Sequence, residues 1–198
     1  MAVALNTNNL ITAAELELML QKTFSDSDYK NTLINIASQF IEGYTNRVIK
    51  SASYTSYING NGMYRLFLPN YPITAITSID AWNIQLQTSS ASYTANTDFI
   101  YNGDEGWIYL YGGWYVGYRN YKIVYTAGYS TVPDTLKIAC AQLAGFIDSN
   151  SSKLGLSSET IGDYSYQKPT AMSSMGINGL AIPGEILSFL QPFVRVVM

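Results

Sequence analysis

Residues 53–68 read SYTSYINGNGMYRLFL, and at this stretch the pattern of the chain changes. Apolar residues before it recur at helical spacing, whereas here β-branched and aromatic residues alternate with polar ones, which is typical of strands. Asn59-Gly60-Asn61-Gly62 separates two such runs, Tyr54 to Ile58 and Met63 to Leu68. The spacing predicts a β-hairpin.

Further strands are predicted after the hairpin, where Pro69-Asn70-Tyr71-Pro72 interrupts the pattern. They are expected at Ile73–Ala81, Ile84–Gln87, Trp107–Tyr111 and Tyr121–Thr126. The polar, Ser-rich residues Thr88–Asn96 predict an exposed loop or an irregular edge between strands. About residues 53–127 are therefore expected to form a small antiparallel sheet.

Two helices are predicted before this sheet. Thr12 and Glu15 have capping-box spacing and open a short first helix. Ser25, Asp26 and Ser27 offer a second cap. The apolar residues that follow it at helical spacing are Leu33, Ile36, Ala37, Phe40, Ile41, Tyr44 and Val48.

A third helix is predicted after the sheet, with Thr131 as its cap and Pro133 in its first turn. Its apolar face comprises Leu136, Ala139, Cys140, Leu143, Ala144 and Ile147. Gly145 within it predicts either close packing against a neighbour or early fraying, because glycine disfavours a helix by about 1 kcal/mol relative to alanine. A last short helix is expected between Pro183 and Pro192.

Residues Ser149–Gly179 are mostly Ser, Gly, Thr and Asn, with too few apolar residues to form a core. They predict an extended arm. The expected fold is α+β and mainly helical: an N-terminal helix pair and a long third helix, with the small sheet inserted between helices two and three. Residues 1–150 would form this domain, and residues 151–198 the arm and the short C-terminal helix.

The composition favours contact over catalysis, with 17 tyrosines, no histidine and 13% charged residues. Tyrosine combines a rigid apolar ring with a polar tip, so it suits protein interfaces. Catalysis by Ser-His-Asp or Cys-His groups needs a histidine and is excluded. Asp104-Glu105 is read as a plain turn, and no metal or cofactor site is predicted. Cys140 is expected to be a buried apolar residue. The chain is therefore not expected to be an enzyme.

One alternative stays open from the aromatic residues. Exposed tryptophans and tyrosines could stack on sugars, as in a carbohydrate-binding module or a small glycosidase. The alternation of Trp107, Tyr109 and Tyr111 more often lines a sheet face or a subunit contact.

The charge and hydropathy of the chain indicate whether DNA or a membrane could be a partner. The formal net charge is −3, and the eleven basic residues are scattered, which argues against specific DNA binding. No apolar run reaches the roughly 18 residues needed to span a bilayer, and no signal peptide is recognised at the start. We expect synthesis and use in cytoplasm, with no membrane partner.

Four local strings, together with the order of elements, resemble the head–tail connector proteins of tailed bacteriophages, also called adaptor or head-completion proteins. The strings are Ile41-Glu42-Gly43-Tyr44-Thr45-Asn46-Arg47, Leu66-Phe67-Leu68-Pro69-Asn70-Tyr71-Pro72-Ile73, Tyr125-Thr126-Ala127-Gly128-Tyr129 leading to Val132-Pro133-Asp134, and Ser158-Glu159-Thr160-Ile161-Gly162-Asp163-Tyr164-Ser165-Tyr166. None is a catalytic motif. The C-terminal residues Phe193–Met198 depart from the resemblance, because Arg195 is their only basic residue.

The resemblance implies a structural virion protein at the head–tail interface, assembled in the host cytoplasm as a homo-oligomeric ring, a dodecamer, beneath the portal protein. Such a ring extends the DNA channel, lets DNA pass without specific binding, and presents a docking surface to a tail-side stopper or tail-completion protein. It implies no enzymatic activity.

The residues expected to contact other subunits or partners lie in the arm and at the C-terminus. They are Ile161, Tyr164, Tyr166, Phe189, Leu190 and Phe193. The competing interpretation is that these side chains only cover the core of their own domain, because aromatic anchors look alike in both settings.

Overall fold

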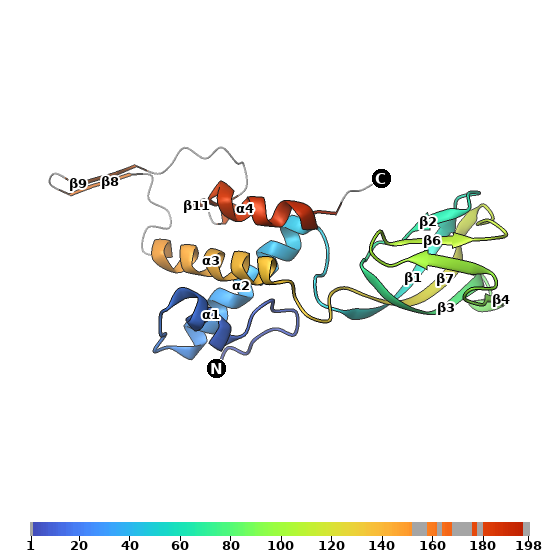
Figure 1. Cartoon of the computed structure of the whole chain (residues 1–198), viewed down its shortest axis with the longest axis horizontal. Coiled ribbons are helices and arrows are strands. Elements are labelled where there is room, and N and C mark those ends of the chain that lie inside the picture. The colour runs from blue at the N-terminus through green and yellow to red at the C-terminus, as the bar shows by residue number, and fades with distance from the viewer. Residues whose placement is uncertain (1, 152–157, 162–163, 168–175, 178–179, 196–198) are drawn as a thin grey trace. The chain divides into compact units, whose positions relative to one another are not determined.

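The computed structural model describes residues 2–151, 158–161, 164–167, 176–177 and 180–195, and the side chains of residues 152–181 lie outside the description. The chain divides into two compact units. The helical unit comprises Met1–Arg47 and Val132–Met198, and the sheet unit is Val48–Thr131. Each is described by itself, and Figure 1 labels the elements of both.

The helical unit contains α1 (Ala13–Leu20), α2 (Ser27–Thr45), α3 (Asp134–Asn150) and α4 (Gly184–Leu190), the last followed by a 3₁₀ turn, Gln191–Phe193. The predicted capping box of α1 is confirmed: Thr12 Oγ1 accepts the Glu15 N–H at 3.2 Å, and the Thr12 N–H donates to Glu15 Oε2 at 2.8 Å. Asp26 caps α2, because its Oδ1 accepts the N–H groups of Asp28 and Tyr29. Local signals therefore set both helix starts.

Helix α3 differs from its prediction at the start and settles the question of Gly145. Thr131 does not cap it; Pro133 takes the cap position without a side-chain hydrogen bond. A Cβ added at Gly145 would lie 2.9 Å from Leu20 Cδ2 of α1, and α3 continues to Asn150. Close packing against a neighbour is therefore the correct alternative.

The core of the helical unit lies between the apolar faces of its helices. Its buried members include Leu16, Ile34, Ile41, Leu136, Ala139, Leu143, Ile186 and Leu190. Three ion pairs surround it: Lys30–Glu17 at 2.8 Å, Lys137–Glu15 at 2.7 Å and Lys22–Asp148 at 2.5 Å. They join α1, or the residues just after it, to α2 and α3.

The sheet unit contains two antiparallel sheets. The larger has the order β1 (Ala52–Gly60), β7 (Gly117–Ala127), β3 (Ile73–Asn83) and β4 (Thr88–Tyr93). The smaller has the order β2 (Arg65–Phe67), β6 (Trp107–Leu110) and β5 (Phe99–Asn102). Side chains from both sheets fill one core, among them Leu66, Ile79, Phe99, Ile108, Trp114, Tyr121, Ile123 and Tyr125.

The predicted hairpin is wrong. Its first run is β1, which pairs with β7, and its second run contains β2, which pairs with β6 in the other sheet. Residues Asn59–Gly62 therefore carry the chain from one sheet to the other. Alternation of residues shows which side chains face the core, but it does not choose the partner strand.

The strand predicted at Ile84–Gln87 is also wrong, because these residues form the turn between β3 and β4. The Ser-rich stretch predicted as an exposed loop or irregular edge contains the edge strand β4, and β5 was not predicted. Strand β4 lies at an edge of its sheet and its residues are almost all exposed, so it lacks the apolar alternation that marks a strand.

The expectation of a mainly helical chain with a small inserted sheet is wrong. Helix accounts for 34% and strand for 31% of the structure, and the strands build a two-sheet unit with its own core. The prediction missed β4, β5 and the short strands of the arm, and it made β1, β3 and β7 too short. In the arm, the described backbone pairs Ser158–Ile161 (β8) with Tyr164–Gln167 (β9), and Gly176–Ile177 (β10) with Leu180–Ala181 (β11).

Candidate assembly surfaces

The six predicted contact residues fall into two groups. The side chains of Ile161, Tyr164 and Tyr166 lie outside the described residues. At the C-terminus, Phe189 is 36% exposed, Phe193 is half-buried and Leu190 is fully buried in the helical unit. Only Phe189 and Phe193 of this second group therefore offer surface to a partner, and the assignment of all six residues as contacts stays a prediction.

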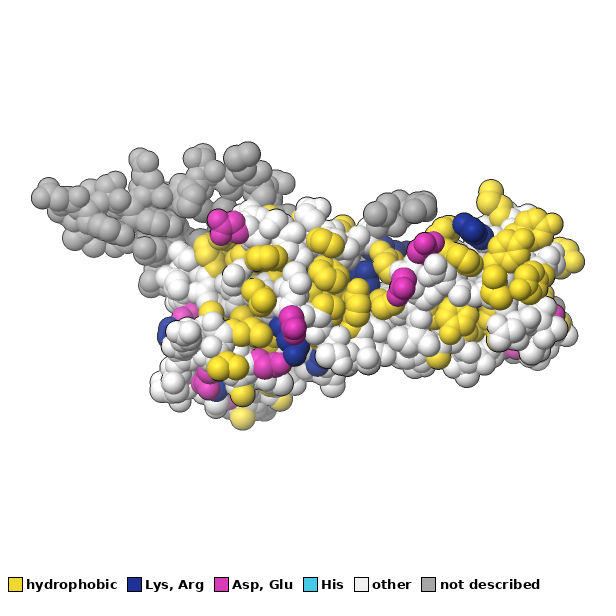
Figure 2. All heavy atoms as spheres, viewed as in Figure 1, with side chains coloured by type: hydrophobic (Ala, Val, Ile, Leu, Met, Phe, Trp, Pro, Cys, Tyr) yellow, Lys and Arg dark blue, Asp and Glu magenta, His cyan; other side chains and the backbone are white. Residues whose placement is uncertain are grey.

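The outward side of the three-stranded sheet is covered with aromatic residues. We call it the aromatic face; it comprises Tyr64, Phe67, Ile100, Trp107, Tyr109 and Tyr111, with Arg65 as its cation. Tyr64, Phe67 and Tyr111 are each at least half exposed. Figure 2 shows yellow side chains gathered over the part of the unit that carries β2 and β6. Alternation explains the pattern within the strands, because Leu66, Ile108 and Leu110 between these residues point into the core. Tyr64 precedes β2 and reaches the face by stacking on Tyr109.

The rings of the aromatic face pack against one another. Tyr64 and Tyr109 are stacked with centroids 5.6 Å apart, and Tyr111 meets Tyr109 edge-on at 5.8 Å. The Arg65 guanidinium lies 4.6 Å from the centroid of Trp107. These contacts cover ring faces that a sugar would need for stacking. The geometry therefore favours a protein contact over the carbohydrate-binding alternative.

The segment before β7, together with the start of that strand, extends the apolar surface of the same unit. Tyr115, Val116 and Tyr118 are 72%, 81% and 70% exposed. Asn120 fixes this segment by donating from Nδ2 to the Tyr115 carbonyl at 2.8 Å. Large apolar side chains held out into water in this way are typical of an interaction site.

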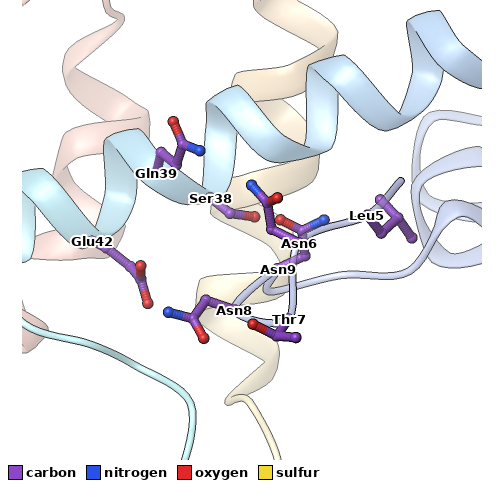
Figure 3. Close-up of a pocket in the computed structure, with 8 residues that line it drawn as sticks. All are labelled: Leu5, Asn6, Thr7, Asn8, Asn9, Ser38, Gln39 and Glu42. Atoms are coloured by element: carbon purple, nitrogen blue, oxygen red, sulfur yellow. The ribbon is translucent and has the colours of Figure 1, made fainter. Parts of the chain in front are cut away.

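A polar pocket of about 470 Å³ lies in the helical unit, between α2 and the turn that precedes α1. Figure 3 shows Asn6, Thr7, Asn8 and Asn9 opposite Ser38, Gln39 and Glu42. Polar side chains of α2 bind the main chain of the N-terminal segment: Asn31 donates to the Val3 carbonyl, Asn35 to the Ala4 carbonyl, and Ser38 accepts the Leu10 N–H. These bonds give the pocket residues a structural role in fixing the segment.

The one thiol is inert. Cys140 is fully buried in α3, and burial raises its pKa to about 12. Its Sγ lies 3.6 Å from Ser38 Oγ. Since the thiolate is the nucleophile, Cys140 stays protonated and is not a catalytic group.

The described part of the chain contains no group of three or more Asp, Glu or Cys side chains that could hold a metal ion. Its helices are each too short or too polar to span a bilayer.

Comparison with known families identifies the chain. The model of the head completion protein family matches residues 9–191. The chain belongs to this family. The resemblance drawn from the four sequence strings is thereby confirmed, and with it a structural protein of the virion that acts in assembly at the head–tail interface. No curated protein matches the chain.

Solved structures share the fold of this head completion protein. Chains from the neck of a native gene transfer agent (GTA) particle computed with C12 symmetry, the neck of an empty GTA particle computed with C6 symmetry, and the virion of a native GTA particle align with TM-scores of 0.59, 0.62 and 0.61. Each is 15% identical, and each alignment covers 100% of this chain and 96% of the other. At this identity the likeness is one of fold.

Sequence reasoning found part of these surfaces. It assigned Trp107, Tyr109 and Tyr111 to one sheet face, and the structure confirms that they share it. It missed Tyr64, Phe67 and Arg65, because the hairpin error paired their strand with the wrong neighbour. The alternation of Arg65 and Phe67 with the buried Leu66 was the available signal for these two residues, whereas Tyr64 has the parity of Leu66 and gave none.

Proposed function

We propose that this head completion protein is a non-enzymatic connector that assembles as a closed ring beneath the portal protein. The ring extends the DNA channel and gives tail-side proteins a docking surface. Family membership supports a structural role, and the exposed aromatic face is the observation that carries the proposal of assembly. An aromatic surface of this kind gains free energy when it leaves water, as it does at a subunit contact.

The ring is expected to close through head-to-tail contacts, in which one surface of a subunit meets a different surface of the next. Two structural neighbours come from particle necks computed with C12 and C6 symmetry, which supports rotational closure. The aromatic face suits such a contact because Arg65 is its one cation and few charges need to lose water.

The arm and the C-terminus are proposed as additional contacts. Ile161, Tyr164 and Tyr166 would bind a neighbouring subunit or the portal, together with Phe189 and Phe193. The buried Leu190 would take part only indirectly, by holding the helix that carries Phe189. DNA would pass without specific binding, because the net charge of −3 offers no cluster of cations to phosphates. Protease digestion with and without the portal tests the arm. Equal resistance in both states would contradict a contact.

The ring is tested by measuring the mass of the purified protein over a range of concentrations and imaging any oligomers. Phe67→Ser with Tyr111→Ser removes two exposed rings and should shift assembly to higher concentration. Leu18→Ser is the matched control, because Leu18 is 77% exposed on the helical unit and lies outside the aromatic face. Assembly that is equally strong in both variants would remove the aromatic face from the proposal. A wild type that stays monomeric alone and with portal would refute the ring.

A further inference from the structure

The outward face of the four-stranded sheet has a pocket at one corner. It has a volume of about 380 Å³ and is lined by Tyr57, Trp82, Ile84, Gln87 and Arg119. Lys122 adjoins it, because its ammonium lies over the ring of Trp82. The rest of β1 on this face is small and polar, with Ser53 and Thr55 exposed. We call this site the cationic corner.

Two cations rest on two rings in the cationic corner. The Arg119 guanidinium lies 5.2 Å from the centroid of Tyr57, and Lys122 Nζ lies 5.0 Å from that of Trp82. The two rings are themselves 5.3 Å apart. A ring face stabilises a cation without neutralising it, so each cation remains available to an anion.

No carboxylate neutralises this pair directly. The ion pairs found among the described residues all lie in the helical unit. Asp80 is opposite Lys122 in the strand register, but the hydroxyls of Ser78 and Ser92 donate to it at 3.1 and 2.5 Å. Asp80 makes no ion pair with either cation but lowers the net charge of the site, so Arg119 and Lys122 leave a net positive charge at this corner.

The backbone around the cationic corner is fixed before any ligand arrives. Arg119 and Gln87 both have positive φ, 47° and 52°, which is rare for residues other than glycine. The Arg119 N–H donates to Asn59 Oδ1 at 2.7 Å, and this bond ties β7 to the end of β1. Strained backbone held by such bonds is typical of binding sites, because preorganisation reduces the entropy lost on binding.

The chemistry of the corner selects its ligand. A cation occupies one face of each ring, so that face is closed to stacking by a sugar or a nucleobase. Two cations alone do not form the row of charges that tracks a nucleic-acid backbone. A single carboxylate fits, because guanidinium and ammonium groups both bind it through charge-assisted hydrogen bonds.

We propose that the cationic corner binds an aspartate or glutamate side chain from the helical unit of a neighbouring copy. This inference rests on the ring proposed above. Asp134 and Glu185 are suitable occupants, since both are exposed in the first turns of α3 and α4 and neither carboxylate makes a hydrogen bond or ion pair with the described residues. The contact joins two different surfaces, as closure of a head-to-tail ring requires.

Charge reversal tests the corner in the full-length protein. Arg119→Glu and Lys122→Glu should each raise the concentration for half-assembly by about tenfold or more, since each places like charges in contact. Ser53→Glu with Thr55→Glu is the control, because it changes the net charge by the same −2 as either reversal, on the same strand face outside the pocket. Arg119→Lys should assemble like wild type. Thermal unfolding confirms that all variants fold.

The outcomes separate this inference from the proposed function. If the wild type and both reversal variants assemble equally, the cationic corner is not a contact, and the ring stands. If the wild type does not assemble, both fail. Loss of assembly in the Ser53→Glu/Thr55→Glu control as well would show a general charge effect and would also overturn the inference.

Cross-linking identifies the occupant. A photoreactive residue placed at Ile84, which lines the corner, is cross-linked in assembled protein mixed from ¹⁵N-labelled and unlabelled copies. We expect mixed-isotope cross-links to the peptides that contain Asp134 or Glu185. Cross-links confined to one copy, or made only to the sheet unit or to a different virion protein, would overturn the proposal.

Discussion

Gly60 of β1 passes so close to Tyr115 that a Cβ added there would lie 1.8 Å from the Tyr115 carbonyl oxygen. The Gly60 N–H also donates to Asn120 Oδ1 at 2.8 Å. The Tyr115 carbonyl belongs to the backbone and cannot rotate away as a side chain can. Gly60→Ala must therefore displace the loop that presents Tyr115 and Val116. We expect a loss of about 2 kcal/mol or more in unfolding free energy, measured by chemical denaturation.

Gly43 of α2 gives the opposite prediction. A Cβ there meets nothing within 4 Å, and the residue lies inside a helix. Gly43→Ala should therefore stabilise the protein by about 0.5–1 kcal/mol through helix propensity alone. The same denaturation measurement checks it. A destabilised Gly43→Ala would show that α2 does not tolerate even a methyl group at this position.

Features that depend on residues close together in the sequence could be predicted, and features that depend on residues far apart could not. The starts of α1 and α2 were correct, because Thr12 and Asp26 bond to main-chain groups within three residues. The sheet pairing was not, because β1 pairs with β7 across some sixty residues and no local signal encodes the choice. The chemistry of the cationic corner was hidden for the same reason. Tyr57, Trp82 and Arg119 come from separate parts of the chain and meet only in the folded sheet unit.

The arm shows a different limit. Its composition predicts an extended segment from residue 151 onward, and the described backbone places two short strand pairs in it. Whether Ile161, Tyr164 and Tyr166 are contacts depends on partners that the sequence does not contain. The assignment rests on their aromatic and apolar character and stays a prediction.

Stability should fall in acid partly through Glu15. The Lys137 ammonium, and then the Thr12 N–H, hold the pKa of Glu15 below its usual value of 4.5. A lowered folded-state pKa contributes stability above about pH 4.5, which is lost as the pH falls through the folded-state pKa. Melting temperatures measured from pH 6 down to pH 3 should therefore drop less steeply in Glu15→Gln than in wild type.

Lys137→Met provides the control for this prediction, since it removes the first cause of the lowered Glu15 pKa and should also flatten the pH profile. The double variant should show little further change, because both substitutions remove one interaction. If the melting temperature of Glu15→Gln fell with pH as steeply as that of the wild type, other carboxylates would govern acid unfolding.

Cys140 should resist thiol reagents in the folded protein. Its pKa of about 12 keeps it protonated at neutral and mildly alkaline pH, and no part of its side chain reaches solvent. Labelling at pH 8 should proceed only as fast as the helical unit opens, and it should accelerate in denaturant. Ser53→Cys places a second thiol on the exposed face of β1 and should label at once. Rapid labelling of Cys140 without denaturant would show that α3 separates readily from α2, against the packing of Cys140 on Ser38.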